Sequence, residues 1–548
     1  MLKLHKRLTF VNNCGIIAVS NNGCIGNVIF YELLCYNKKY FGGFIMKKHV
    51  RVIAMMLSLI TLLLSVVSCA ETGTENETTA TPETQAPSAS VESTEAETTA
   101  EETLFTPDDL KEKYEFNETI TIFMWDDYRM TEFYAEETGD IIADSIYHRN
   151  IKVGDRLGVT FEFVEEPGDS GDYKDWIKKA ENDRAADNDY DIYAGYSRSA
   201  PLMAIKGMNA NLLDFEVFNV DKPWWPEALT SECTVNDKLY FCTGDIATSM
   251  LWYMNGFMYN KDLYKDYIST EKTPMDMVLN NEWTMDIFFG MVKDLYVDNN
   301  QDGTKDKTDF FGATMYSTDL GAFQIGSGIT SLEKGEDGAL RISEKWNSQL
   351  CADICALLGS YIQQPGVYAA TSASRTPFFN QTSIFHMDRI FLIKGVDNGN
   401  SEDKVTFACG VVPVPKYDNT IEKYRTNLGN PYTIYAVNAT SKKLEAAVTT
   451  LEAMGSENYR SVTPAVFEVA MKVRYQDDPQ ASEMFDILKE GVSFDFGKLY
   501  GTSFGDVTSN LFPNTANSPN YSAFLTQLKK SERIINKGIK DLMEVYGK

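Results

Sequence analysis

The chain has 548 residues with a formal charge of −27, and 12% of its residues are aromatic. The residues after position 68 number 43 basic against 77 acidic, a formal charge of −34. So negative a field excludes nucleic acid and anionic lipid as partners. A body of about 440 residues is also too long for one hydrophobic core, so we expect two lobes.

A signal-peptide pattern occupies Met46–Cys69. It runs from Met-Lys-Lys-His-Val-Arg through the apolar stretch Val52–Leu64 to Ser-Val-Val-Ser-Cys. The apolar stretch is shorter than the roughly 20 residues of a spanning helix. Val-Val-Ser-Cys resembles the lipobox of bacterial lipoproteins, where cleavage before the cysteine leaves a thiol that carries a diacylglycerol. The alternatives are an ordinary signal peptide or a short membrane anchor.

The resemblance to a lipobox makes 46–68 a lipoprotein signal peptide and Cys69 the lipidated residue. The body of the protein is then expected at the extracellular face of the cell membrane. Residues 1–45 do not fit an exported protein, and we interpret them as an upstream extension from a misassigned start codon. Residues 69–110 are mostly Glu, Thr, Ala, Ser and Pro, and we expect a disordered acidic linker.

Strands and helices alternate in the first part of the body. Strands are predicted at 118–125, 159–164 and 191–196, with helical patterns at 143–157 and 176–184 between them. This alternation indicates an α/β fold with parallel strands. Ligands on such sheets bind at the carboxyl ends of strands, where Trp125 and Tyr196 stand.

Five cysteines and two histidines remain in the body. Cys233 and Cys242 flank a predicted hairpin that turns at Asn236-Asp237, and their Cβ atoms are expected to lie too far apart for a disulfide. Cys351 and Cys355 lie four residues apart on a predicted helix. We therefore expect free thiols. With only His148 and His386, a histidine-rich zinc site is not expected.

Later helices have clear signals. A helix is predicted to open after Thr284, which is a candidate N-cap. Another is predicted over 444–454, closing at Gly455, and a further one is expected to begin at Thr463-Pro464. An apolar stripe predicts a final helix over 524–546.

Four motifs follow one another in a characteristic order: Lys-Leu-Tyr-Phe at 238–241 with Thr-Gly-Asp at 243–245, Met-Tyr-Asn-Lys-Asp-Leu at 258–263, and Glu-Trp-Thr-Met-Asp at 282–286. They resemble the extracellular solute-binding proteins of bacterial ABC importers, of the large sugar-binding, clostridial type. Asp-Lys-Pro-Trp-Trp at 221–225 and Thr-Pro-Ala-Val-Phe at 463–467 are similar to further segments of that family. The resemblance covers nearly all of 116–548.

The resemblance implies a two-lobe periplasmic-binding-protein-like fold of type II, whose lobes are joined by a crossover hinge and close on a ligand. Lobe 1 would be 116–245 plus 417–475, and lobe 2 would be 250–412 plus 480–548. The first crossover is expected near Thr243–Asn255 and the second near Val412–Lys416.

Aromatic platforms and hydrogen-bonding side chains suit a sugar. The candidates are Trp125, Tyr196, Asp245, Trp252, Asp388 and Arg389. Three have ordinary alternatives: Trp252 as core, Asp245 as an N-cap and Arg389 as a surface ion pair. Trp224-Trp225 is expected to pack at a lobe edge.

The loop 298–309 has the spacing of a calcium loop, with oxygen side chains at its first, third, fifth, ninth and twelfth positions and glycine at the sixth. The ligands of a structural Ca²⁺ would be Asp298, Asn300, Asp302, Thr304, Asp306 and Asp309. Asp309 stands where a longer Glu is usual. A solvated acidic turn is the alternative.

The function that the resemblance implies is non-enzymatic. A monomeric, lipid-anchored receptor would capture a solute, expected to be a sugar or oligosaccharide, and deliver it to an ABC permease. No catalytic cofactor is implied. A surface glycan-active enzyme and an adhesion or scaffold lipoprotein are the alternatives.

Overall fold

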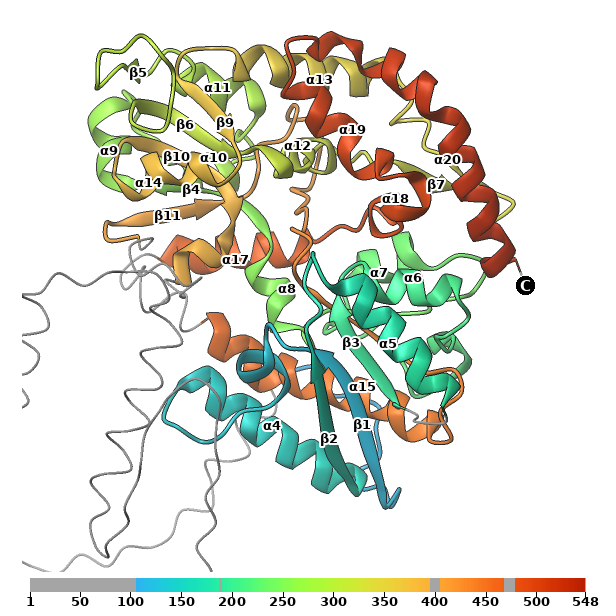
Figure 1. The fold of residues 1–548 in the computed structure, drawn as a ribbon. Coiled ribbons are helices and arrows are strands. Elements are labelled where there is room, and N and C mark those ends of the chain that lie inside the picture. The colour runs from blue at the N-terminus through green and yellow to red at the C-terminus, as the bar shows by residue number, and fades with distance from the viewer. Residues whose placement is uncertain (1–104, 187–189, 395–404, 468–478, 548) are drawn as a thin grey trace, which may run out of the picture. The chain divides into compact units, whose positions relative to one another are not determined.

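The computed structural model describes residues 105–186, 190–394, 405–467 and 479–547, all within one unit, Thr94–Lys548. Figure 1 shows two α/β lobes in this unit. The extension 1–45, the signal peptide, Cys69 and most of the linker lie outside the described residues. No helix in the described ranges is long and apolar enough to span a bilayer.

Lobe 1 is built on a four-stranded sheet. Its strands, in the order β12-β3-β1-β2, are Thr433–Val437, Ile192–Tyr196, Glu118–Trp125 and Val159–Glu166. β1 pairs in parallel with β2 and β3, as the alternation of strands and helices predicts, and β12 is antiparallel to β3. Cys242 extends the sheet through an antiparallel bridge to Tyr435.

Lobe 2 is built on a six-stranded sheet. Its strands are β4 (Asn255–Asn260), β5 (Tyr296–Val297), β6 (Phe310–Tyr316), β9 (Val367–Ala370), β10 (Ser383–Arg389) and β11 (Cys409–Val412). The path is β11-β4-β10-β6, with β5 and β9 both on the outer side of β6. A separate hairpin joins β7 (Leu332–Lys334) and β8 (Leu340–Ile342).

The two large sheets share one order. In lobe 1 it is β2-β1-β3-β12 and then the Cys242 bridge, and in lobe 2 it is β9-β6-β10-β4-β11. In both sheets the fourth strand, β12 or β4, runs antiparallel to its neighbours. This repeated order confirms the predicted two-lobe α/β fold.

Helices cover the sheets. In lobe 1, α4 packs with α15 and α5 packs with α6, and Figure 1 shows these pairs on different sides of the sheet. The lobe 1 helices are α4 (Ile141–Leu157), α5 (Tyr173–Ala185), α6 (Ser199–Ile205), α7 (Glu227–Cys233) and α15 (Leu444–Glu457). The short helix α8 (Thr248–Trp252) lies between the lobes.

Lobe 2 carries the remaining helices, which include the C-terminal ones. They are α9 (Lys261–Tyr267), α10 (Pro274–Leu279), α11 (Met285–Val292), α12 (Gly321–Gly326), α13 (Gln349–Ile362), α14 (Arg375–Phe379), α17 (Pro479–Glu490), α18 (Phe496–Leu499), α19 (Val507–Ala516) and α20 (Phe524–Tyr546). Short 3-10 or π turns are η1 (Arg129–Phe133), η2 (Leu212–Asp214), η3 (Ser317–Asp319), η4 (Ser372–Ser374), η5 (Ile390–Lys394), η6 (Asn458–Val462), η7 (Gly501–Phe504) and η8 (Tyr521–Ala523).

Two segments pass between the lobes side by side. The first is the predicted one, through α8 to Asn255, and it pairs with the second through the Met254–Leu428 bridge and a 2.9 Å bond from Asn255 N to Asn427 O. The second crossover was predicted near Val412–Lys416, and this prediction is wrong. Lys416 lies inside lobe 2, bridged to Thr284, because Trp283 Nε1 donates to Pro413 O at 2.7 Å and fixes the chain there.

Two predicted helix ends also differ. α15 runs through Gly455 and continues as η6 and helical residues 463–467, so neither the stop at Gly455 nor the new start at Thr463 exists. Gly455 serves packing instead: a Cβ there would lie 2.8 Å from Trp224 Cδ1. Thr284 does precede α11, although its side chain makes no capping bond.

The cysteine prediction is confirmed for the described residues: Cys233, Cys242, Cys351, Cys355 and Cys409 are free and buried. The turn at Asn236-Asp237 is also present, with φ of 49° and 56°. It follows α7 rather than a strand, so the predicted hairpin is reduced to one bridge between Val235 and Lys238.

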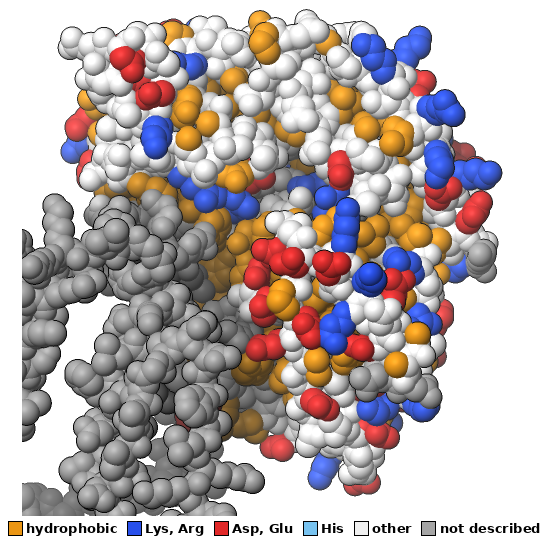
Figure 2. Space-filling view, viewed as in Figure 1, with side chains coloured by type: hydrophobic (Ala, Val, Ile, Leu, Met, Phe, Trp, Pro, Cys, Tyr) orange, Lys and Arg blue, Asp and Glu red, His pale blue; other side chains and the backbone are white. Residues whose placement is uncertain are grey.

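The border between the lobes is charged on the face drawn in Figure 2. Asp and Glu side chains gather on lobe 1 below this border, and Lys and Arg side chains line lobe 2 above it. Opposite charges on facing borders favour approach of the two lobes.

Candidate ligand-binding site

The carboxyl ends of β1 and β3 bring two predicted residues together. The ring centroid of Trp125 lies 5.8 Å from that of Tyr196 and 5.1 Å from that of Tyr128. β1 and β3 are parallel neighbours, so residues at their ends share one edge of the sheet. This edge is an aromatic wall on lobe 1.

The aromatic wall continues onto the crossing segment and lobe 2. Tyr253, just after α8, lies edge-on to Tyr128 at 6.0 Å and stacks on Phe391 at 5.3 Å. Phe391 follows β10 in the chain. An unbroken series of rings therefore runs from one lobe to the other through the hinge.

Lobe 2 adds a charged group at the end of β10. Asp388 is fully buried, and its carboxylate accepts hydrogen bonds from Arg375 Nε at 2.7 Å and Arg389 Nε at 3.0 Å. The guanidinium of Arg389 lies over the rings of Tyr253, Tyr316 and Phe391 at 5.5, 4.8 and 5.4 Å. Asp388 and Arg389, both candidate ligand residues from the sequence, thus lie beside the rings.

Electrostatics fixes the ionisation of this group. Burial opposes ionisation of Asp388, but the charge of Arg389, together with His386 and Arg375, outweighs it and holds the pKa of Asp388 far below its usual value. Burial lowers the pKa of His386. Asp388 is therefore a carboxylate that orients two guanidinium groups.

A buried hydrogen-bond network joins the aromatic wall to the hinge. Trp125 Nε1 donates to Thr433 Oγ1 at 2.9 Å, and Thr433 N donates to Ser249 Oγ at 2.9 Å. Ser249 lies on α8, and its N–H donates to Glu132 Oε2 at 2.9 Å. A ring platform in lobe 1 and the first crossing segment therefore share hydrogen-bond partners.

We call Trp125, Tyr128, Tyr196, Tyr253, Tyr316, Arg375, Asp388, Arg389 and Phe391 the inter-lobe cluster. It contains four of the six predicted ligand residues. Trp252 is buried in α8. Sequence reasoning chose it and missed its neighbour Tyr253, because residue type alone does not show which side chain of a short helix turns toward the ring series.

Asp245 lies elsewhere, at a cavity of about 820 Å³ that Trp224, Trp225 and Lys489 also line. Its carboxylate binds Lys489 Nζ at 2.8 Å and accepts from Thr463 Oγ1 at 2.7 Å. The two tryptophans are buried and donate to Glu452. We place the candidate site at the inter-lobe cluster because its series of rings runs from lobe 1 through the crossing segment to lobe 2.

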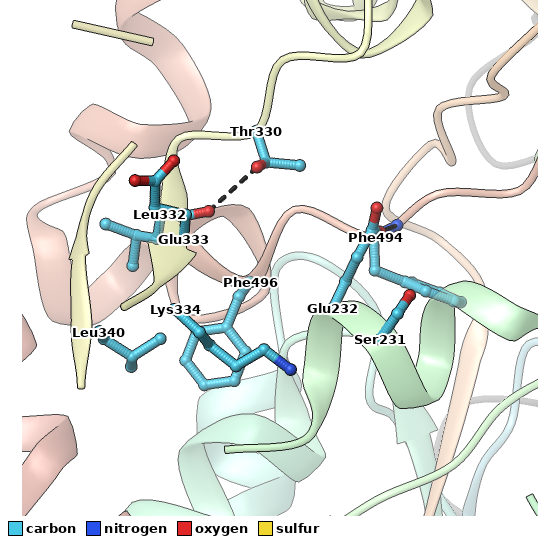
Figure 3. Close-up of a pocket in the computed structure, with 9 residues that line it drawn as sticks. All are labelled: Ser231, Glu232, Thr330, Leu332, Glu333, Lys334, Leu340, Phe494 and Phe496. Carbon is cyan, nitrogen blue, oxygen red and sulfur yellow. Dashed lines mark hydrogen bonds between the residues drawn. The ribbon is translucent and has the colours of Figure 1, made fainter. Parts of the chain in front are cut away.

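A second cavity is drawn in Figure 3 and measures about 160 Å³. Ser231 and Glu232 from α7 lie beside Phe494, and the β7–β8 hairpin lies on the opposite side of the cavity. Glu232 accepts from Phe494 N at 2.5 Å and from Arg425 Nη1 at 3.1 Å. Ligand pockets usually measure about 300–1,000 Å³, so this cavity is a gap in a contact between the lobes.

The carboxylates of the loop 298–309 accept hydrogen bonds from the loop itself and from Tyr296. Asp309 accepts from Tyr296 OH at 3.0 Å, Asp306 N at 3.1 Å and Asn299 N at 3.3 Å, and Asp306 accepts from Thr308 N at 2.8 Å. Within the described ranges, no group of three or more His, Cys, Asp or Glu is arranged to hold a metal ion. Calcium binding by Asp298, Asn300, Asp302, Thr304, Asp306 and Asp309 stays a prediction.

Comparison with known proteins gives structural likeness only. A scan of protein-family models finds no match, and a search of curated proteins finds none. Among solved structures, the chain is similar to an ABC substrate-binding protein from Listeria monocytogenes in complex with cycloalternan (14% identity, 78% of this chain, 99% of that chain, TM-score 0.46). It is also similar to the maltose/maltodextrin-binding domain MalE from Bdellovibrio bacteriovorus bound to maltotriose (14% identity, 77% of this chain, 100% of that chain, TM-score 0.46). A third similar structure is the sugar-binding protein MalE from the phytopathogen Xanthomonas citri (12% identity, 76% of this chain, 98% of that chain, TM-score 0.48). The fold assignment rests on the repeated sheet order.

Proposed function

We propose that this chain is an extracellular solute-binding protein that captures a carbohydrate between its two lobes, leaves it chemically unchanged and delivers it to an ABC permease. The observation that carries the proposal is the series of rings from Trp125 to Phe391, which spans lobe 1, the crossing segment and lobe 2. Rings stack on the apolar faces of sugars, and the polar groups beside them suit hydroxyls.

The mechanism is a shift between two arrangements of the lobes. A ligand that contacts Tyr128, the partly exposed ring of lobe 1, and Arg389 in lobe 2 gains both sets of contacts only when the lobes are together. Tyr253, on the first crossing segment, contacts both sides. Ligand binding therefore favours the closed arrangement, which the permease would recognise.

The proposal includes an anchor on the membrane. The lipobox-like Val-Val-Ser-Cys sequence supports a diacylglycerol on Cys69. The Glu- and Thr-rich tract that follows, about 35 residues as a flexible coil, would span roughly 35 Å and let both lobes stand clear of the bilayer.

The experiment is a thermal-shift screen of the full chain against neutral oligosaccharides, followed by calorimetry. A binder at a hundredfold excess over Kd stabilises the protein by about 2.7 kcal/mol. Tyr253→Ala should lower the affinity at least about tenfold, because it removes the central ring of the series. The matched control is Tyr267→Ala, which truncates an exposed tyrosine on α9.

Chromatography of the recovered sugar completes the test. Unchanged sugar and a selective loss in Tyr253→Ala support the proposal. Release of shorter sugars, or equal affinities in the two variants, would contradict it.

A further inference from the structure

The positive charges of lobe 2 in the inter-lobe cluster are already neutralised. Arg375 and Arg389 both bind Asp388, and Arg389 Nε also lies 3.5 Å from Asp319 Oδ2. Two guanidinium groups thus share two carboxylates, and one of these carboxylates is fully buried. Neither guanidinium of the inter-lobe cluster is therefore a free cation for an acidic ligand.

Lobe 1 carries three carboxylates near its rings. Asp126 and Asp127 directly follow Trp125, at the carboxyl end of β1. Asp169 follows Gly168, which packs so closely that a Cβ there would lie 2.8 Å from Trp125 Cβ. No lysine or arginine side chain in the described part of the chain forms an ion pair with any of the three.

These carboxylates act on one another and on the rings. Burial, and then the charges of Asp126 and Asp169, raise the pKa of Asp127 to about 6. The charge of Asp127 adds to burial in raising the pKa of Tyr128 and of Tyr253. Asp127 therefore lies within electrostatic reach of the rings that would contact a ligand.

We infer that the inter-lobe cluster selects carbohydrates that carry no anionic group, takes uncharged and amine-bearing sugars, and rejects uronates and sugar phosphates. This inference rests on the proposed function and names its substrate class. The negative charges of Asp126, Asp127 and Asp169 attract an ammonium group and neither attract nor repel an uncharged sugar. A ligand carboxylate would instead be desolvated next to like charges. This repulsion lowers the affinity of the site for anionic sugars.

The test compares three forms of one oligosaccharide. The probes are the tightest neutral binder of the screen, its counterpart oxidised at C6 to a uronate, and its counterpart with an amine at C2. Calorimetry with the full chain should show the uronate binding at least about tenfold more weakly than the neutral sugar at low salt. The amine-bearing sugar should bind no more weakly than the neutral sugar. Added salt should reduce the difference in affinity between the uronate and the neutral sugar.

Variants assign the effect to these carboxylates. The double variant Asp127→Asn with Asp169→Asn should improve uronate binding about tenfold and leave neutral-sugar binding unchanged. The asparagine at position 169 keeps an oxygen for the bonds that Gly171 N and Asp172 N donate to the aspartate. Asp126→Asn with Asp127→Asn is the second variant, should the first not fold. Glu344→Gln, at a side chain that is 82% exposed on lobe 2, is the matched control for charge and should change neither affinity.

Each outcome has one meaning. Uronate binding as tight as that of the neutral sugar, or a uronate affinity that neither variant changes, overturns the charge selection while the proposed function stands. Absence of binding by any of the three sugar forms overturns the proposed function and this inference with it. A neutral-sugar affinity that falls with both variants would overturn the view that these carboxylates act by repelling anions.

Discussion

Glu452 is a carboxyl group enclosed by two indoles. Trp224 and Trp225 donate to its oxygens at 3.2 and 3.0 Å, and Asn219 N donates at 3.3 Å. Burial nevertheless raises its pKa from 4.5 to about 8. The folded state then binds more protons than the unfolded state between these values, so stability is greatest below pH 4.5 and falls as the pH rises toward 8.

Glu452→Gln should therefore flatten the pH dependence of stability. Each unit of pKa shift corresponds to about 1.4 kcal/mol, so the wild type should lose up to a few kcal/mol relative to the variant between pH 5 and 8. Denaturant unfolding at several pH values measures this difference. Glu344→Gln should keep the wild-type slope, and a Glu452→Gln slope equal to that of the wild type would refute the argument.

At the scale of single elements, Gly429 shows how closely the second crossing segment approaches lobe 2. A Cβ there would lie 2.2 Å from Arg389 Cδ, and the N–H of Gly429 donates to Tyr253 O at 2.8 Å. Any side chain would displace the guanidinium from the rings of the inter-lobe cluster. The glycine therefore allows the second crossing segment to pack directly against Arg389 of the inter-lobe cluster.

Gly429→Ala should destabilise the protein by about 1–3 kcal/mol, the usual cost of overpacking, and should also weaken sugar binding. The matched control is Gly290→Ala on α11, where a Cβ would meet nothing within 4 Å. That control should stabilise the protein by roughly 0.5–1 kcal/mol, since alanine is the better helix former. Thermal unfolding of both variants decides, and equal effects would show that the Gly429 contact is unimportant.

The periodicity of apolar residues and the positions of the strand ends made much of the fold predictable from the sequence. β1 was predicted with its observed bounds, and the strand ends identified Trp125 and Tyr196. The helix stop at Gly455 failed because glycine there makes room for Trp224 rather than a left-handed turn. Tyr253 and the Thr426–Gly429 crossing were missed because both depend on pairing between segments more than 170 residues apart, which no local pattern shows.

At the scale of the whole molecule, an ion pair joins the lobes. Arg198, before α6 in lobe 1, binds Asp506, before α19 in lobe 2. Asp506 has φ of 60°, a conformation that is strained for a residue with a side chain. A Cβ on Gly501 would lie 2.7 Å from Arg198 Nη2, so the site accommodates this arginine closely.

Arg198→Glu should favour the open arrangement of the lobes. Partly exposed ion pairs contribute about 1 kcal/mol or less, so we expect a few-fold loss of sugar affinity and a larger radius of gyration. Calorimetry and solution scattering measure the two effects. Arg198→Glu combined with Asp506→Arg should recover part of the loss, and a double variant no better than the single one would exclude the pair as a latch.

The strand β12 has a consequence for how the protein is made. It completes the lobe 1 sheet, yet it follows the strands of lobe 2 in the chain, so a ribosome must translate past residue 437 before the first sheet can close. Until then β3 presents an unpaired edge, and the nascent polypeptide is a substrate for chaperones rather than a finished module. For the export that we propose, such late closure would keep the polypeptide able to thread through a translocation pore until it has left the cytoplasm.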